Sequence, residues 1–486
     1  MAATTPSQAT RGELPADLES VICAEMRRTQ VPGLAICAFD ADGVRFVGAF
    51  GSADIKRGEA VSSSTVFRAA SISKLVAATC ILRLVDQGSL DLDTDVREYL
   101  QPAHYIRASD GAATAEVTLR QLLSHNSGLP GSARGVQAVN PVMNAFAGGR
   151  NAGSGLGELV KGLRLAYEPG SRIVYANDGF SLLGQVVAET TGETYEAAAA
   201  ELVLKPVGMD VSELAAILRG PGVATPHGPI ALGGALKPAE PLRVHATPMG
   251  GLYTTVTDLA RLGGMLLRGG LAGSPDSRAR ILDEATVDEA FSMQVRNQPD
   301  LDEGYGLGFI SRAWRGCRLV GHDGNMPGVA NRFVMLPEVG VGIAVLTNAG
   351  AMPTTYRVAQ RGLEVLLGLD PEPEPGSPAG ITTGMDEWQA LTARACGRWH
   401  VLDYATSRFL DTMTRIAMPI HITHVGDGRL CLESRMFVGE PAWLYPDGEP
   451  GRYRLAFPVG AGTRAVIEDT PDGLDLWWGT LHFRKG

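Results

Sequence analysis

A serine and a lysine three positions apart, Ser71 and Lys74, are the residues of this sequence best suited to do chemistry. Residues at this spacing on a helix share a face, with Cβ atoms about 5–6 Å apart. A serine hydroxyl is a weak nucleophile until a neighbouring base takes its proton. A lysine is that base only where burial or another cation destabilises its ammonium form. The apolar residues after Lys74 predict such burial, although the spacing alone is also that of a helix-start serine followed by a solvated lysine.

Two later segments carry residues that would complete a site around this pair. Tyr175 and Asn177 precede a predicted helix, and His322 and Gly324 end a predicted strand. A tyrosine hydroxyl can relay a proton to a leaving group when a nearby cation lowers its pKa, and the asparagine amide can hold the lysine or donate to a substrate carbonyl. Alternation along a strand places His322 and its successor on opposite sides, and Gly324 lets a substrate backbone approach. Taken alone, the tyrosine and the histidine are also typical of structural residues.

The order of these motifs carries more information than any one of them. Ser-x-x-Lys, Tyr-x-Asn and His-x-Gly follow one another along the chain. In this the chain resembles the penicillin-recognising serine hydrolases, which include class C β-lactamases, D-alanyl-D-alanine carboxypeptidases, D-aminopeptidases and family VIII esterases. Segments 119–129, 249–259 and 305–309 also look like that family's, and the resemblance covers about residues 15–369. In that pattern His125, Ser127 and Gly128 are structural.

The resemblance implies a role for each motif residue. Ser71 would be the acylated nucleophile, Lys74 the amine that deprotonates or orients it, and Tyr175 the general base and acid. The substrate-binding residues would be Asn177, His322, Gly324 and Asn325. His322 would polarise Tyr175 or bind the acyl side of the substrate. The oxyanion hole would consist of the backbone N–H groups of Ser71 and Asn325, and two such donors lower the barrier by a few kcal/mol.

The predicted function is a serine hydrolase that cleaves a small ester, amide or peptide through a Ser71 acyl-enzyme, with no metal or other cofactor. The alternative is an acyltransferase or cyclase of a biosynthetic pathway, similar to penicillin-binding-protein-type thioesterases, in which an amine or alcohol replaces water. Both functions use the same catalytic residues. A non-enzymatic scaffold or ligand sensor on an inactive fold would have lost a motif residue, and none is lost.

Two features disfavour a β-lactamase, and the second of them also disfavours a D-alanyl-D-alanine carboxypeptidase. The third motif begins with His322, where most β-lactamases of this kind carry lysine. Histidine is neutral or partly charged at pH 7, so it is a weaker anchor for a β-lactam carboxylate. Residues 1–14 lack the apolar core of a secretory signal, whereas both of those substrates lie outside the cytoplasm. The sequence therefore predicts a cytoplasmic protein.

Composition argues against several partners. The 486 residues are 45% hydrophobic and 20% charged, as in ordinary globular proteins. A net charge of −10 without a Lys/Arg cluster disfavours nucleic acid and anionic membranes, and no apolar run approaches the ~20 residues of a membrane span. The six cysteines stand singly, which predicts buried thiols in a reducing compartment. His421 and His424 would face opposite sides of a strand, which argues against a metal site.

The elements that must position the site predict an α+β fold. A hairpin over residues 33–50 and late strands between 305 and 346 would form one antiparallel, β-lactamase/transpeptidase-like sheet with helices inserted between them. Residues 385–486 alternate like a small all-β domain, and the resemblance implies a lipocalin-like barrel. We predict a disordered N-terminus (1–14), a catalytic domain (15–369), a stiff Pro-rich linker (370–384) and the barrel domain (385–486).

Overall fold

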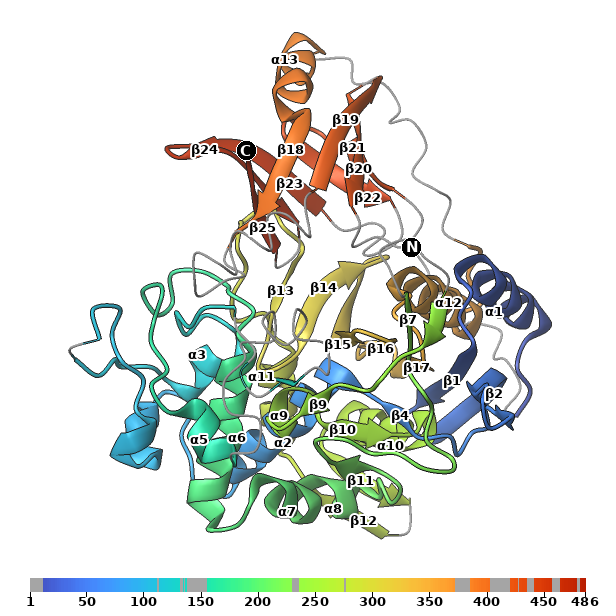
Figure 1. The fold of residues 1–486 in the computed structure, drawn as a ribbon, viewed down its shortest axis with the longest axis vertical. Coiled ribbons are helices and arrows are strands. Elements are labelled where there is room, and N and C mark those ends of the chain that lie inside the picture. The colour runs from blue at the N-terminus through green and yellow to red at the C-terminus, as the bar shows by residue number, and fades with distance from the viewer. Residues whose placement is uncertain are drawn as a thin grey trace.

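The computed structural model (Figure 1) describes residues 12–111, 113–131, 134, 136–137, 155–229, 236–274, 277–371, 385–402, 420–426, 428–434, 441–456, 464–478 and 481–486. These ranges leave out residues 1–11 of the predicted disordered terminus and residues 372–384 of the predicted linker. They also leave out most of residues 131–157, whose Gly, Ala and Asn content predicts a long irregular loop. The domain boundaries therefore stay predictions.

An eight-stranded antiparallel sheet forms the body of the molecule. Its strand order is β13-β14-β15-β16-β17-β1-β2-β3. The strands are β1 (Gly33–Asp40), β2 (Gly43–Asp54), β3 (Glu59–Ala60), β13 (Glu303–Tyr305), β14 (Ile310–Trp314), β15 (Cys317–Met326), β16 (Val329–Leu336) and β17 (Val341–Thr347). The N-terminal hairpin β1–β2 joins the late strands where β1 pairs with β17. The predicted α+β arrangement is confirmed.

Each face of this sheet is covered by helices, and β1 shows how the sequence specifies the two faces. Successive side chains of a strand point to opposite sides. Leu34, Ile36 and Ala38 are buried with residues of α1 (Ala16–Thr29) and α12 (Met352–Leu366). The intervening Ala35, Cys37 and Phe39 are buried in the larger core that contains α2 (Ser73–Asp86) and α10 (Val256–Leu267). A strand covered on both faces is apolar throughout, as β1 is.

The helical region lies between β3 and β13 in the sequence. Its other helices are α3 (Leu119–Leu123), α5 (Leu156–Val160), α6 (Asn177–Thr191), α7 (Tyr195–Ala199), α8 (Lys205–Val207), α9 (Thr247–Gly250) and α11 (Glu284–Phe291). Single turns are η1 (Ala70–Ile72), η2 (Val96–Tyr99), η3 (Pro102–His104) and the π turn η4 (Ala200–Leu204). Short strands are β4 (Phe67–Arg68), β5 (Val136–Gln137), β6 (Glu213–Leu214), β7 (His227–Pro229), β8 (Leu236–Pro238), β9 (Arg243–Val244), β10 (Leu252–Thr254), β11 (Leu271–Ser274) and β12 (Ser277–Arg280).

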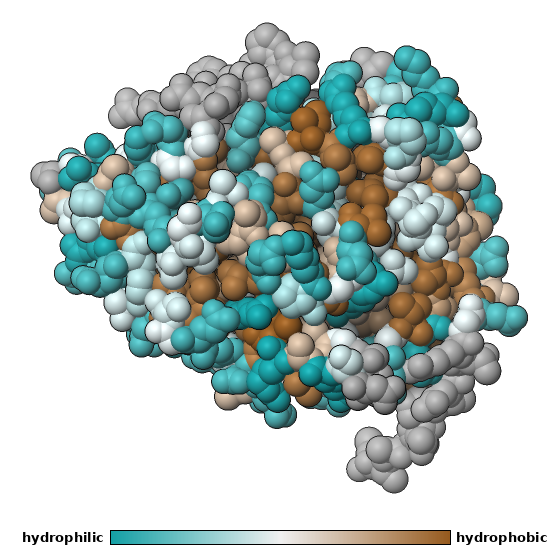
Figure 2. Space-filling view, turned by 90° about the horizontal axis from the view of Figure 1, so that it is seen from below, coloured by the Kyte–Doolittle hydropathy of each residue, from teal (hydrophilic) through white to brown (hydrophobic). Residues whose placement is uncertain are grey.

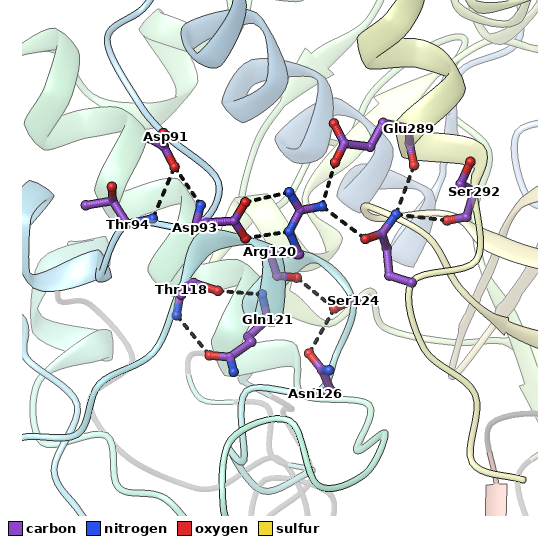
Figure 3. A network of polar contacts seen from close by, with 11 residues as sticks. Asp91, Asp93, Thr94, Thr118, Arg120, Gln121, Ser124, Asn126, Glu289 and Ser292 are labelled. Atoms are coloured by element: carbon purple, nitrogen blue, oxygen red, sulfur yellow. Dashed lines mark hydrogen bonds and ion pairs between the residues drawn. The ribbon is translucent and has the colours of Figure 1, made fainter.

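The short helix α3 is held at both ends by polar contacts (Figure 3). At its start Thr118 and Gln121 form a reciprocal capping box, as the sequence predicts for Thr118. Arg120 spans the gap to α11: its guanidinium donates to Asp93 at 2.6 Å and to Glu289 at 2.7 Å. These contacts position the chain that leads to residue 125, which lies in the site described below.

The late strands predicted from residue 305 onward are interrupted at residues 306–309, which form the turn between β13 and β14. Gly308 has φ 87°, which favours glycine, and a Cβ there would lie 2.5 Å from Cβ of Ala78 in α2. A Cβ on Gly306 would lie 2.1 Å from the carbonyl oxygen of Ala290. The chain therefore bends where two helices pass close to it, which is a tertiary contact that local alternation does not reveal.

The C-terminal residues form a closed barrel of eight strands. Its strands are β18 (Gly397–Val401), β19 (Ile420–Gly426), β20 (Arg429–Ser434), β21 (Ala442–Pro446), β22 (Arg452–Ala456), β23 (Arg464–Thr470), β24 (Gly473–Trp478) and β25 (Leu481–Lys485). A helix that the sequence analysis did not predict, α13 (Met385–Ala395), precedes them. Its Trp388 is fully buried in the barrel core with Trp399 and Tyr453, so side chains fill this core.

The surface seen in Figure 2 mixes apolar and polar side chains. On this face, seen from below Figure 1, brown patches are separated by hydrophilic residues and form no single apolar area. No helix in the described part of the chain is long and apolar enough to cross a membrane. All six cysteines are free thiols, and Cys37, Cys80 and Cys431 are buried.

Candidate active site

Ser71 lies in the turn η1, at the entrance to α2, and is partly buried. The residue before it, Ala70, has φ 51°, an uncommon value for a residue with a side chain. The Ser73 hydroxyl closes the turn, because it donates to the carbonyl oxygen of Ala70 at 2.6 Å and accepts from the backbone N–H of Leu252 at 2.9 Å. Such backbone strain persists only where the surroundings impose it, and here Ser73 and β10 impose it beside Ser71.

Lys74 is fully buried one turn further along, with its amine beside Ser71 as the spacing predicts. Its Nζ lies 3.1 Å from Ser71 Oγ, 2.7 Å from Asn177 Oδ1 and 3.0 Å from the carbonyl oxygen of Met249. Burial holds the pKa of this amine well below its usual range. The two carbonyl oxygens only accept hydrogen bonds. In the neutral amine they take the two N–H groups, and the lone pair is left for Ser71.

Tyr175 and Asn177 enter the site at the start of α6. Asn177 is the first residue of this helix, and the Tyr175 ring centroid lies 4.8 Å from Lys74 Nζ. The neighbouring Val174 and Ala176 donate backbone hydrogen bonds to the carbonyl oxygen and to Nδ1 of one residue, His125, at 2.8 and 3.1 Å. The second motif is thus brought to the first by the side chain of Asn177 and by the backbone contacts of His125.

His322 enters from β15 on the other side of Tyr175, with ring centroids 6.0 Å apart. Its Nδ1 donates to the carbonyl oxygen of Asp323 at 2.6 Å, so Nε2 carries the lone pair. Burial, reinforced by Lys74, lowers the pKa of His322 to about 3. Its Nε2 is buried and has no hydrogen-bond partner among the residues that the structure describes. His322 is therefore a neutral acceptor at physiological pH.

Asp323 points to the opposite face of β15, as strand alternation predicts. Its carboxylate pairs with Arg332 at 2.7 Å and accepts a hydrogen bond from Tyr356. Burial raises the pKa of Asp323 to about 6. The acid next to His322 thus belongs to the packing between the sheet and α12, and its side chain does not reach the site.

Gly324 lies close to another segment of the protein itself, whereas the sequence predicts that it lets a substrate backbone approach. A Cβ at this position would lie 2.0 Å from the carbonyl oxygen of Ala69, two residues before Ser71. The glycine therefore lets β15 run directly beside η1. Asn325 follows at an exposed position, so the two predicted oxyanion donors come from segments in direct contact.

Replacement of Gly324 by alanine is expected to lower both stability and activity. The new methyl group would meet a backbone oxygen that cannot move without shifting Ser71, and such overpacking costs about 1–3 kcal/mol. Chemical denaturation and kcat on an ester substrate measure the two effects. Gly155→Ala is the matched control, because nothing lies within 4 Å of a Cβ there. An unfolding midpoint unchanged in Gly324→Ala would contradict the expected clash.

Two residues of the site were underrated or missed by sequence reasoning. His125, predicted as structural, packs its ring against two tyrosines, with ring centroids 4.5 Å from that of Tyr175 (tilted) and 4.7 Å from that of Tyr305 (edge-on). Its backbone φ of 58° makes this placement possible, and no local pattern announces that angle. Met249 contributes only its carbonyl oxygen, for which side-chain motifs give no signal. Among the described residues there is no group of three or more His, Cys, Asp or Glu side chains that could hold a metal.

Comparison with known proteins identifies the family of the chain. The Beta-lactamase family model matches residues 18–366. Penicillin-binding protein 4 of Amycolatopsis lactamdurans is 31% identical over 345 residues, which cover 67% of this chain and 83% of that protein. Esterase EstB of Burkholderia gladioli is 32% identical over 200 residues, which cover 40% and 50%. The octameric penicillin-binding protein homologue from Pyrococcus abyssi shares the fold, with TM-score 0.61, 23% identity and coverage of 96% of this chain and 99% of that one.

The family match spans the segments that carry all three motifs, and the fold likeness extends through the barrel. The chain therefore belongs to the beta-lactamase family, within the penicillin-recognising serine hydrolases.

Proposed function

We propose that this protein is a serine hydrolase that cleaves a small ester or amide through an acyl-enzyme on Ser71. The observation that carries the proposal is the environment of Lys74 Nζ. Two carbonyl oxygens and one hydroxyl lie around a fully buried amine whose pKa is lowered by burial. This arrangement favours a neutral amine with its lone pair directed at Ser71, which is the requirement for a lysine base.

The proposed reaction moves one proton around the site. Ser71 Oγ bonds to the substrate carbonyl carbon as its proton passes to Lys74. The backbone N–H groups of Ser71 and Asn325 stabilise the oxyanion. As the bond to the leaving group breaks, Tyr175 donates a proton to that group and regains one from Lys74. Water then attacks the acyl carbon. As the bond between that carbon and Ser71 Oγ breaks, the water proton passes through the same pair to Ser71 Oγ, and the free acid leaves.

The neutral state of His322 favours substrates that carry no carboxylate over β-lactams. A β-lactam carboxylate is best held by a permanent cation, and His322 is uncharged above a pKa of about 3. Simple esters and amides have no carboxylate that needs such a partner. The ester is the easier substrate, because its leaving group depends less on the proton from Tyr175.

A substrate panel tests this proposal. We expect turnover of p-nitrophenyl esters and of D-amino-acid amides, and a kcat/KM at least about tenfold lower on a chromogenic cephalosporin, which corresponds to 1.4 kcal/mol of transition-state binding. The reverse preference would overturn the assignment. The products are analysed with and without an added amine. Free acid alone supports hydrolysis, and an amide of the added amine would show acyl transfer instead.

A further inference from the structure

One loop links the barrel to the candidate active site. Residues 294–305, called here the connecting segment, run from the end of α11 into β13 and end at Tyr305. In Figure 1 the loop before β13 lies next to the barrel, and its residues contact Arg464 and Glu468 of β23. Neither the motifs nor the proposed function assigns this segment a role.

The barrel side of the segment is held by polar contacts and by one apolar contact. Three polar contacts join it to the barrel: Gln298 Nε2 to Glu468 Oε1 at 2.8 Å, Asp300 to Arg452 at 2.7 Å, and the backbone N–H of Arg464 to Asp302 Oδ1 at 3.1 Å. Leu301 is buried against Val466 and Trp477, in a cluster separate from both domain cores. The side chains of this loop are thus ordered by residues of β22, β23 and β24.

The site side of the segment reaches the residues around Tyr175. Asn297 Oδ1 accepts a hydrogen bond from the backbone N–H of Ile173 at 3.0 Å. At the end of the segment the Tyr305 ring lies 4.7 Å from His125 and 6.4 Å from Tyr175. Val295 pairs with Tyr305 through backbone hydrogen bonds of 2.9 and 3.2 Å, so both ends of the loop are tied together.

The stretch before α6 therefore has supports on two sides. The backbone N–H groups of Val174 and Ala176 donate to His125, and that of Ile173 donates to Asn297. His125 belongs to the helical region, whereas Asn297 lies on a loop that also contacts the barrel through Gln298 and Leu301. A displacement of the loop would move the backbone two residues from Tyr175.

We propose that the barrel is part of the active-site structure: it holds the connecting segment, and through Asn297 and Tyr305 the segment sets the position of Tyr175. Asn297 is then a positioning residue. This inference rests on the proposed function in one respect, the role of Tyr175 in proton transfer. A misplacement of about 1 Å in a reacting group costs up to about 100-fold in rate. A small displacement of the connecting segment would therefore lower kcat.

The first arm of the test changes Asn297 in the full-length protein. Asn297→Ala removes the acceptor for Ile173, and we expect kcat to fall about 10- to 100-fold with KM little changed. The loss should be larger for an amide than for an ester, because the amide leaving group depends more on the proton from Tyr175. Asn297→Asp keeps an acceptor oxygen and should recover most of the activity. Equal losses in both variants, or an unchanged kcat in the alanine variant, would overturn the proposal.

The second arm changes the barrel contact. Leu301→Ala weakens the apolar contact with β23 and β24, and we expect a smaller loss of kcat with the same amide-over-ester bias. In the double variant with Asn297→Ala the losses should be less than additive, because both act on one loop. Arg394→Gln is the control. It breaks an exposed ion pair between α13 and Asp469 of β23, on the surface of the C-terminal domain, and should leave kcat unchanged. Additive losses, or an equal loss in the control, would overturn the proposal.

Tyr175→Phe distinguishes a failure of the proposed function from a failure of the positioning role alone. Activity is normalised to the fraction of protein that reacts with a fluorophosphonate, so partial unfolding does not count as lost catalysis. If Tyr175→Phe retains full kcat, the role of Tyr175 in the proposed function is wrong. If Tyr175→Phe is impaired while Asn297→Ala and Leu301→Ala are not, the positioning role alone is wrong.

Discussion

Ser71→Ala is expected to abolish acylation and to reduce kcat by on the order of 10⁴- to 10⁶-fold, the loss typical when a serine nucleophile is removed. No other serine or threonine hydroxyl among the described residues lies within hydrogen-bond distance of Lys74 Nζ, so none can take the place of Ser71. The fold should survive, because Ser71 is only partly buried and the turn is closed by Ser73. Active-site titration with a fluorophosphonate, followed by mass spectrometry of the labelled peptide, measures the effect.

Ser73→Ala is the control for this labelling, because it lies two residues away in the same peptide. Its loss leaves the buried N–H of Leu252 without an acceptor, which costs about 1–3 kcal/mol of stability. The label should nevertheless persist in Ser73→Ala. Equal labelling of wild type and Ser71→Ala would show that the nucleophile lies elsewhere.

Lys74→Met is expected to lower kcat/KM by about 10²- to 10⁴-fold, the usual contribution of a general base. Methionine fills a similar volume and introduces no buried charge, so the protein should remain folded. In the wild type kcat/KM should fall as the pH falls through the depressed pKa of Lys74, because the protonated amine has no lone pair for Ser71. That midpoint should lie well below the 10.5 of an exposed lysine and should be absent from the pH profile of Lys74→Met.

Lys74→Arg distinguishes a base from a fixed cation. Arginine stays protonated at all working pH values, so it keeps the charge and loses the basic lone pair. We expect this variant to be as slow as Lys74→Met across pH 6 to 10. Substantial activity in Lys74→Arg would mean that Lys74 acts by charge and that Tyr175 is the base.

Much of the site was predictable because its residues sit at short, regular spacings. Ser71 and Lys74 are one helical turn apart, and Asn177 follows Tyr175 at the start of a helix. The sheet was predictable because strand patterns stand at the start and the end of the catalytic region with helical patterns between them, which is typical of an antiparallel sheet with inserted helices.

The remainder depends on contacts between distant segments. The bend at Gly308 is imposed by Ala78, and the helix α13 stands where strand alternation was expected. His125 and Asn297 reach the backbone of Ala176 and Ile173, on either side of Tyr175, only once the chain has folded. Residue type and spacing do not carry this information, because the local sequence does not distinguish a positioning asparagine such as Asn297 from other asparagines in polar loops.

The pairing of β1 with β17 has a consequence for the order in which the protein becomes active. Leu34 pairs with Thr347, and almost the whole helical region lies between them in the chain. Closing so large a loop is entropically costly, so this sheet should form late and slowly. During synthesis we expect the β1 edge of the hairpin β1–β2 to stay unpaired until residue 347 has left the ribosome. We therefore expect chaperones to bind the nascent chain mainly in that interval, while this edge is exposed.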